Sequence, residues 1–279
     1  MRTIDLAVVT AKVKEMFIEA CEDIPSNVLC ALKNAKQVEQ SPLGKEVLSK
    51  IVENDLLARD KHLPICQDTG VAVVMLTIGS EVTFTGDIYE AVNEGVRQAY
   101  TEGYLRKSVV RHPLDRVNTR DNTPAIVHVK LVPGDVFRID VAPKGGGSEN
   151  MSVVKMLIPA DGVEGIKKLV LDTVFNAGGK PCPPIIVGLG IGGNFEKCAM
   201  MAKEALFREI DDSSPDPIAC KLEQELKEEI NKLGVGPMGF GGTVTCLAVK
   251  VNTYPCHIAS LPVAINIQCH AARHKTCNI

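Results

Sequence analysis

The sequence contains no tryptophan, and aromatic residues of all kinds make up only 4% of its 279 positions. Proteins that bind single-stranded nucleic acids stack the bases on aromatic side chains, so a site of that kind is disfavoured. The formal net charge of −3 at pH 7 also provides no basic surface for phosphate backbones or anionic membranes. The hydrophobic core must therefore be aliphatic, and nucleic-acid binding has little support.

Long apolar runs are missing as well. The sequence has no stretch of roughly 18 apolar residues, the length that a membrane-spanning helix needs. Its N-terminal stretch, MRTIDLAVVTAKVKEMF, carries charges among the apolar positions and lacks a small-residue cleavage site, so it does not read as a signal peptide. We therefore expect a cytoplasmic protein.

Ten cysteines are present, but no two are spaced as Cys-x-x-Cys. A zinc ribbon or a thioredoxin-type redox site is therefore disfavoured. Disulfides are rare in cytoplasmic proteins. The cysteines are better interpreted as free thiols or metal ligands than as a disulfide framework.

The first third of the chain has the pattern of amphipathic helices. Apolar residues such as Leu6, Val9 and Val13 recur at three- and four-residue spacing. Serine and proline at the start of one segment, and glycine at the end of others, are typical helix boundaries. After the helix that contains Leu6, we expect helices at residues 26–38, 41–59, 87–102, 163–176, 194–210 and 217–233.

Strands are expected where β-branched apolar residues run together, at 71–79, 185–190, 243–252 and 263–268. The runs AIVHVKLV and VFRIDVAP flank Pro-Gly-Asp, which predicts a β-hairpin. Helices and strands do not alternate regularly, so the predicted fold class is α+β: a helical N-terminal third followed by mixed, largely antiparallel sheets packed with helices. The stretch DDSSPDP reads as a surface connection, and we expect residues 1–279 to form a single domain.

Three cysteines are distinguished by their neighbours: Cys66 in LPICQDTG, Cys182 in GGKPCPPIIVG, and Cys269 at the end of the strand-like run LPVAINIQ. Proline and glycine fix the backbone and leave a sulfur at a turn, as a metal or cluster ligand requires. A free cysteine is also among the most buried residue types. Spacing alone therefore does not select these three, and it leaves open whether Cys66 is a nucleophile, half of a disulfide, a metal ligand or a small buried residue.

Two glycine-rich stretches could approach a ligand. Gly145, Gly146 and Gly147 in APKGGGSENMS follow a strand, and such a loop either directs backbone amides at an anion or is a plain turn. In VGLGIGGNFEK the glycines have the G-x-G-x-x-G spacing of dinucleotide-binding loops. The acidic residues at the required distance, Asp211 and Asp212, follow a helix rather than a strand, so close strand–helix packing or an anion site at the helix N-terminus is the competing interpretation.

Several polar residues are candidates for substrate contacts. His257 lies just past a strand, and Arg106 or Arg111 could bind a carboxylate with two parallel hydrogen bonds. Each residue also has an ordinary structural interpretation, since single histidines are usually structural and arginines usually lie on a solvated face.

Six motifs in order along the chain resemble a known family: LPICQDTG, RDNTPAIVHVKLVPGD, APKGGGSENMS, KPCPPIIVGLGIGGNFEK, GPMGFGGTV and NIQCHAAR. Together they resemble the alpha subunit of the two-subunit, iron-sulfur class I fumarate hydratases. The alpha subunit of L-tartrate dehydratase is a close relative of that family. The resemblance covers the chain from about residue 5 to the end.

The resemblance implies that Cys66, Cys182 and Cys269 hold a 4Fe-4S cluster. Such clusters usually have four cysteine ligands. Three would leave one iron without a protein ligand, and catalytic metal sites keep an open position of this kind. The open iron would act as a Lewis acid in the interconversion of (S)-malate with fumarate and water.

The resemblance also assigns roles to other residues. Asp68 would be the catalytic base or its activating partner, and Gln67 and Arg106 would bind the substrate carboxylates. His257 would contact the substrate or orient the leaving oxygen. The backbone of Gly145, Gly146 and Gly147 would line the same pocket.

Single-chain members of the family continue into a second domain, whereas this sequence ends ten residues after Cys269. We therefore expect a beta subunit that completes the active site, in an α2β2 assembly. Three alternatives stay open: an L-tartrate dehydratase alpha subunit, a non-catalytic iron-sulfur sensor subunit, and a nicotinamide-dependent oxidoreductase built on the Gly188–Gly193 loop.

Overall fold

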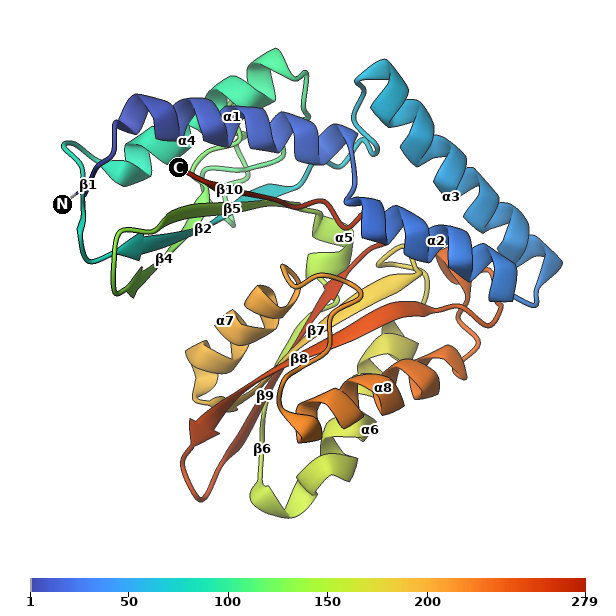
Figure 1. Cartoon of the computed structure of the whole chain (residues 1–279). Coiled ribbons are helices and arrows are strands. Elements are labelled where there is room, and N and C mark those ends of the chain that lie inside the picture. The colour runs from blue at the N-terminus through green and yellow to red at the C-terminus, as the bar shows by residue number, and fades with distance from the viewer. Residues whose placement is uncertain (1) are drawn as a thin grey trace. The chain divides into compact units, whose positions relative to one another are not determined.

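The computed structural model describes residues 2–279 and confirms the predicted α+β class, with helices first and mixed sheets packed by helices after them (Figure 1). The chain divides into two compact units. The first unit contains residues 2–25, Asn54–Gly146 and Arg273–Ile279. The second unit contains Ser26–Glu53 and Gly147–Ala272, and each unit has a four-stranded sheet of its own.

The sheet of the first unit has the order β10 (Lys275–Asn278), β5 (Phe137–Lys144), β2 (Val71–Gly79) and β4 (Ile126–Val132). Strand β2 runs antiparallel to β5 and parallel to β4. The hairpin predicted from residues 125–143 is therefore wrong, because β2 lies between its two strands. The more apolar β2 takes the buried central place and leaves the half-exposed β4 at the edge.

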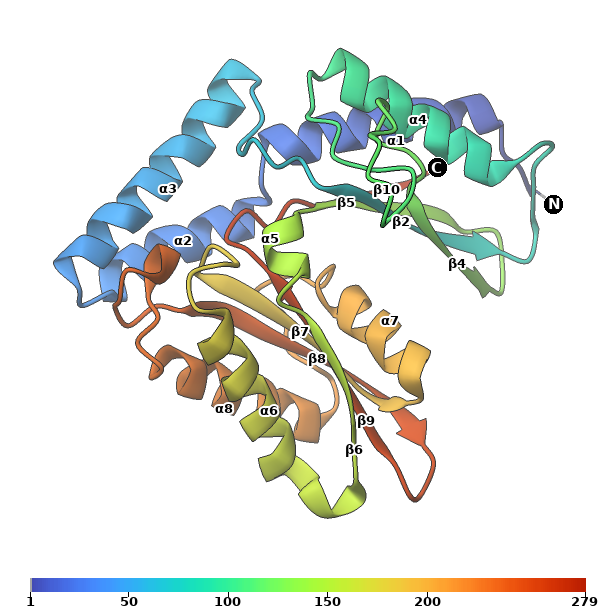
Figure 2. The same cartoon turned by 180° about the vertical axis from the view of Figure 1, so that it is seen from behind.

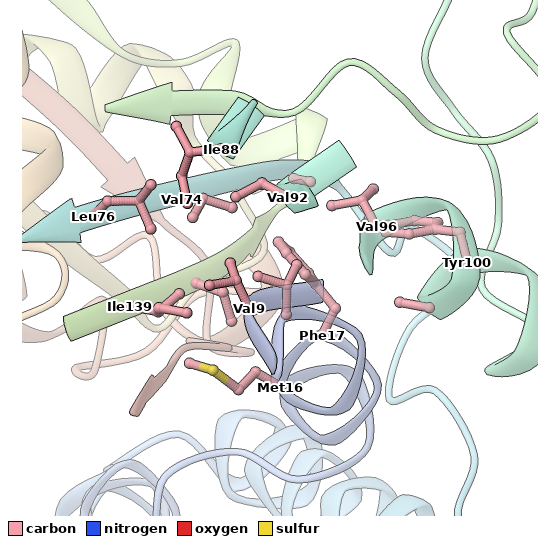
Figure 3. Close-up of a cluster of buried hydrophobic side chains, with 14 of the residues drawn as sticks. Val9, Met16, Phe17, Val74, Leu76, Ile88, Val92, Val96, Tyr100 and Ile139 are labelled. Atoms are coloured by element: carbon pink, nitrogen blue, oxygen red, sulfur yellow. The ribbon is translucent and has the colours of Figure 1, made fainter. Parts of the chain in front are cut away.

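Helices α1 (Leu6–Glu22) and α4 (Ile88–Glu102) cover one face of this sheet and supply much of its core (Figure 3). Each begins at an aspartate N-cap, Asp5 and Asp87, whose side chain accepts backbone N–H bonds from the first turn. The two helices approach closely at Gly95, where a Cβ atom would lie 2.7 Å from the Thr10 carbonyl oxygen. A small two-stranded sheet pairs β1 (Arg2–Thr3) with β3 (Val82–Thr83).

The sheet of the second unit has the order β6 (Val153–Leu157), β9 (Leu261–Gln268), β7 (Ile185–Gly193) and β8 (Cys246–Cys256). Helix α7 (Phe195–Ala205) packs on one face of the sheet. Helices α6 (Gly162–Ala177) and α8 (Pro217–Asn231) pack on the other, which gives this unit three layers (Figure 2).

The remaining elements are α2 (Ser26–Val38), α3 (Pro42–Lys61), the one-turn helix α5 (Gly146–Glu149) and two short 3-10 turns at Pro159–Asp161 and Pro237–Gly239. All the long predicted helices are present, although α7 ends at Ala205 rather than at residue 210. Strands β6 and β10 were not predicted.

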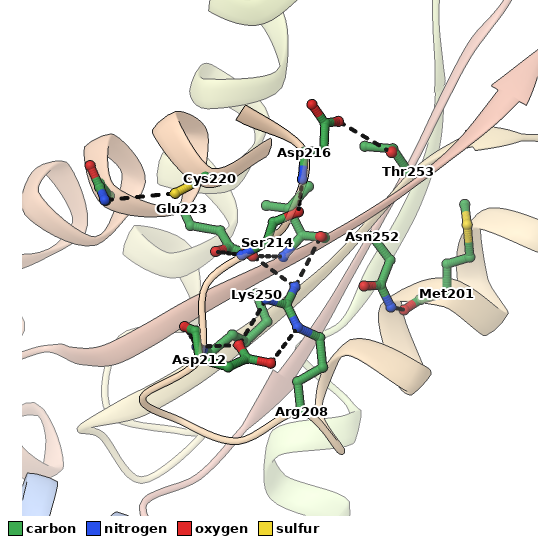
Figure 4. Close-up of polar contacts among 12 residues, drawn as sticks. Met201, Arg208, Asp212, Ser214, Asp216, Cys220, Glu223, Lys250, Asn252 and Thr253 are labelled. Carbon is green, nitrogen blue, oxygen red and sulfur yellow. Dashed lines mark hydrogen bonds and ion pairs between the residues drawn. The ribbon is translucent and has the colours of Figure 1, made fainter. Parts of the chain in front are cut away.

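The stretch DDSSPDP is a largely exposed connection between α7 and α8, as expected, but buried charges anchor it (Figure 4). Glu223, only 6% exposed, accepts hydrogen bonds from Arg208 and from the Ser214 and Val251 amides. Lys250, only 3% exposed, donates to both the carbonyl and the side chain of Asp212. These charges are paired and hydrogen-bonded, which is the condition for burying them.

Among residues 2–279, no helix combines the length and the apolar character needed to cross a membrane.

Candidate functional site

The segment that carries Cys66 is fixed at both backbone groups of Ile65. The Ile65 amide donates to the Cys21 carbonyl oxygen at 2.9 Å, and its carbonyl accepts a hydrogen bond from the Asn54 side chain at 2.9 Å. Cys66 follows directly, with a half-buried side chain whose thiol contacts the Gln67 side-chain oxygen at 3.5 Å. The Cys66 thiol therefore lies on a loop between α3 and β2 that the two hydrogen bonds of Ile65 hold in place.

Asp68 connects two stretches that were predicted separately. Its Oδ1 accepts the Gly70 amide at 3.0 Å, and its Oδ2 accepts the Gly146 amide at 2.8 Å. A Cβ atom at Gly145 would lie 3.3 Å from the same Oδ2. The first unit therefore brings Asp68 against the first two glycines of the triple-glycine stretch, whereas Gly147 belongs to the second unit.

Arg106 is held near this segment through its backbone. The Thr69 hydroxyl donates to the Arg106 carbonyl oxygen at 2.9 Å, and Thr69 itself is buried. The Arg106 and Gln67 side chains are both exposed. The Arg106 guanidinium and the Gln67 amide are thus exposed on segments joined through Thr69, and side chains of these kinds can bind carboxylates.

Two residues of this region were missed by sequence reasoning. Asn122 is fully buried, and its side-chain nitrogen donates to the Gly70 carbonyl oxygen at 3.1 Å. Its side-chain oxygen accepts hydrogen bonds from the Ser108 amide at 2.7 Å and the Val109 amide at 3.1 Å. Arg273, 3% exposed, donates to the Asp68 carbonyl oxygen at 2.7 Å. Both lie in motifs that carry the family resemblance, and that was the available signal.

In the second unit, Cys182 and Cys269 lie at the same end of the sheet. Cys182 precedes β7 and Cys269 follows β9, and these strands are antiparallel with Ile186 opposite Gln268. The His270 amide donates to the Cys182 carbonyl oxygen at 3.3 Å. Both thiols are half-buried. Two cysteines far apart in the sequence therefore lie at the same end of the sheet of the second unit.

His257 lies at the opposite end of that sheet, in the exposed turn between β8 and β9. Strand β9 has eight residues, so its first and last residues are roughly 23 Å apart at a rise of about 3.3 Å per residue. The His257 ring accepts a hydrogen bond from the Ala259 amide at 3.1 Å, within the turn. Cys182, Cys269 and the His257 of the same chain are therefore not gathered into one site.

The other cysteines have different surroundings. Cys21, Cys198 and Cys246 are completely or almost completely buried, and burial raises the pKa of Cys21 to about 11 and that of Cys246 to about 12. Such thiols resist the deprotonation that metal binding requires. None of the ten cysteines, all within the described residues, forms a disulfide, which excludes the disulfide interpretation of Cys66 in this structure. Among residues 2–279, no three His, Cys, Asp or Glu side chains are grouped so as to hold a single metal ion.

The G-x-G-x-x-G stretch is explained by packing. Gly188 and Gly190 lie inside β7, beneath α7. A Cβ atom at Gly188 would lie 2.3 Å from the Ala202 carbonyl oxygen, and one at Gly190 would lie 2.0 Å from that of Cys198. These glycines let α7 approach the strand, so the nicotinamide interpretation loses its main support.

Comparison with known proteins identifies the class of protein to which this α+β chain belongs. Residues 10–278 match the family described as fumarate hydratase (Fumerase). The putative L(+)-tartrate dehydratase subunit alpha of Methanocaldococcus jannaschii is 46% identical over 268 residues, which is 94% of each chain. The L(+)-tartrate dehydratase subunit alpha of Escherichia coli K12 is 32% identical over 257 residues, which is 91% of this chain and 84% of that one.

The chain therefore belongs to the fumarate hydratase (Fumerase) family, a family of lyases, as the motif resemblance predicted. The two relatives named here are both called alpha subunits.

Proposed function

We propose that this chain is the alpha subunit of an iron-sulfur hydro-lyase that interconverts a four-carbon hydroxy-diacid with its dehydration product, (S)-malate with fumarate being the first candidate. The convergence of Cys182 and Cys269 at one end of the second unit carries this proposal. Membership of the fumarate hydratase family supports the reaction class. In this proposal the two units serve one catalytic domain, in a cytoplasmic enzyme.

The donor set fits a 4Fe-4S cluster. Cys66, Cys182 and Cys269 form no disulfide, are half-buried and lie on loops. Thiolates are the usual ligands of such clusters. Three thiolates would leave one of the four irons without a protein ligand. When bound, the cluster would supply a Lewis acid that stabilises the negative charge on the departing hydroxide.

The chain's own polar residues would bind and orient the substrate. Arg106 and Gln67 would each bind one carboxylate, and the glycine backbone from 145 to 147 would line the pocket. Asp68 is anchored by the Gly70 and Gly146 amides, so it is held in a fixed position. We propose that it activates or serves as the base that removes the proton from carbon 3, a role that requires close and fixed placement.

His257 would have to act on a site of another chain. Because it lies at the far end of β9 from Cys182 and Cys269, a substrate contact by His257 would require a second alpha chain or the beta subunit to bring the two together. An α2β2 assembly would allow this. The alpha-subunit names of the relatives support a beta partner for this chain.

L-tartrate is an equally supported substrate, because the two relatives described above are named tartrate dehydratase subunits. L-tartrate differs from (S)-malate by one additional hydroxyl group. Steady-state rates of the anaerobically prepared complex with its beta subunit on (S)-malate and on L-tartrate decide between them. No turnover of either diacid by a cluster-loaded complex would instead favour the sensor-subunit alternative and would overturn the proposal.

A further inference from the structure

Glu39 is a charged residue with no exposed surface, at the turn between α2 and α3. Its Oε1 accepts the Gln40 and Ser41 amides, both at 2.8 Å. Its Oε2 accepts the Thr243 amide at 2.9 Å and the Val244 amide at 2.8 Å. Burial acts to raise the pKa of this carboxyl, but the amide hydrogen bonds outweigh it and lower the pKa overall. The buried group is therefore an ionised and fully hydrogen-bonded carboxylate.

The carboxylate fixes one end of a tight glycine-rich loop, Gly236–Gly242. Gly242 has a φ of +134°, and a Cβ atom there would lie 2.7 Å from Glu39 Oε1, so only glycine fits against the carboxylate. The loop closes on itself, because a Cβ atom at Gly236 would lie 2.1 Å from the Gly241 carbonyl carbon. The loop is therefore compact, and Glu39 fixes one side of it.

The other side of the loop lies against the residues around Cys182. The Met238 amide donates to the Pro183 carbonyl oxygen at 2.7 Å. Gly239 packs on Gly179, where a Cβ atom at Gly239 would lie 2.6 Å from the Gly179 α-carbon. The Cys182 amide in turn donates to the Gly179 carbonyl oxygen at 3.0 Å. The loop therefore contacts the chain on both sides of the cysteine.

Cys182 needs such support because its φ is +54°. Non-glycine residues rarely adopt this left-handed conformation, and it persists only where the surrounding structure fixes it. We propose that Glu39 is a positioning residue for Cys182, which it holds in ligand geometry through the Gly236–Gly242 loop. The significance of this for metal binding rests on the proposed function, in which Cys182 is a cluster ligand.

The test compares Glu39→Gln with wild type in the metal-free, reduced chain, using the rate at which iodoacetamide alkylates each cysteine, followed by peptide mass spectrometry. Glutamine cannot accept hydrogen bonds with its nitrogen, so the loop should open locally. We expect alkylation of Cys182 to rise roughly tenfold while that of Cys269 stays unchanged. Glu46→Gln, on an exposed carboxylate of α3, is the matched control and should change neither rate.

Equal increases at Cys182 and Cys269, or no increase at either, would overturn the proposal. If Glu39→Gln does not fold, Thr243→Val keeps the backbone amide bonds to Glu39 and removes the two contacts of the Thr243 hydroxyl, to Glu39 Oε1 and from the Gln40 amide, each at 3.2 Å. The same selective effect is then expected at smaller size. Anaerobic reconstitution with iron and sulfide distinguishes a failure of the proposed function from a failure of the positioning role of Glu39. A wild-type chain that takes up no cluster contradicts the proposed function, whereas a selective change at Cys182 still supports the positioning role.

Discussion

At the scale of single residues, the cysteines differ most in how deeply each is buried. Cys21, Cys198 and Cys246 are buried, and burial raises the pKa of all three. Cys66, Cys182 and Cys269 are half-buried in loops. Spacing in the sequence could not separate these groups, because the three cysteines come from distant segments. Only the motif resemblance selected them, and the burial pattern is consistent with that selection.

Asp55 on α3 is 3% exposed, and neither of its side-chain oxygens has a hydrogen-bond partner in the described part of the chain. Burial raises the pKa of Asp55 from 3.8 to about 7, although Arg59 opposes the shift. Between these values the folded protein holds a proton that the unfolded chain lacks, so this group lowers stability as the pH rises. Asp55→Asn should therefore stabilise the protein by roughly 3 kcal/mol more at pH 8 than at pH 5.

Urea unfolding at the two pH values measures this difference. Asp60→Asn, on an exposed residue of the same helix, should show no comparable pH-dependent gain. Equal effects of Asp55→Asn at both pH values would contradict the assignment of a raised pKa to this carboxyl.

Asn122 should control substrate binding without touching the substrate. Its side chain joins the Gly70 carbonyl to the Ser108 and Val109 amides, and so it holds the Asp68 and Arg106 segments in register. Asn122→Ala should lower kcat/KM of the complete enzyme by roughly a hundredfold, as misplacement by about 1 Å can do. Cluster content should stay at the wild-type level. Unchanged kinetics, or the same loss in Asn34→Ala on the exposed face of α2, would refute this role.

Among the helices and strands, local patterns predicted most segments but not how the strands pair. Both β4 and β5 form where expected, yet β2 lies between them. A turn signal such as Pro-Gly-Asp identifies a reversal of the chain but not the strands that pair beyond it. Gly79 makes room for the connection, because a Cβ atom there would lie 2.2 Å from the Gly134 carbonyl oxygen. Strand β10 has only four residues and no clear apolar alternation, so its sequence carried little signal.

The connection between α7 and α8 depends on Glu223, which bonds Arg208 and two backbone amides. Glu223→Ala should destabilise the protein by roughly 3–5 kcal/mol, because it leaves a partly buried guanidinium and a buried amide without this partner. The change should appear as a lower urea midpoint. Glu228→Ala, an exposed position on the same helix, is the control, and comparable losses in the two variants would rule out a special role for the buried charge.

For the molecule as a whole, the residues predicted for the site divide between the two units. Cys66, Gln67, Asp68, Arg106, Gly145 and Gly146 belong to the first unit, and Gly147, Cys182, His257 and Cys269 belong to the second. No local rule of helices, strands or turns predicts that segments so far apart in the sequence belong to one proposed site. The strand predicted at residues 263–268 does lie between His257 and Cys269, as β9 does in the structure, but the family resemblance assigned both residues to one site without regard to that separation.

If another chain completes the site, the alpha chain alone should have little activity even when it carries its cluster. Anaerobically reconstituted alpha chain should dehydrate malate or tartrate at less than about a hundredth of the rate of the complex with its beta subunit, since missing positioning groups cost factors of this size. Substantial turnover by the alpha chain alone would exclude an obligate partner.

The most direct test of the central claim is iron and acid-labile sulfide analysis of anaerobically reconstituted chain. Wild type and Cys220→Ser should each contain about four irons and four sulfides per chain, as a 4Fe-4S cluster requires. Replacing Cys66, Cys182 or Cys269 by serine should remove most of both. A wild-type chain without iron and sulfide, or three serine variants that retain the full complement, would contradict the account.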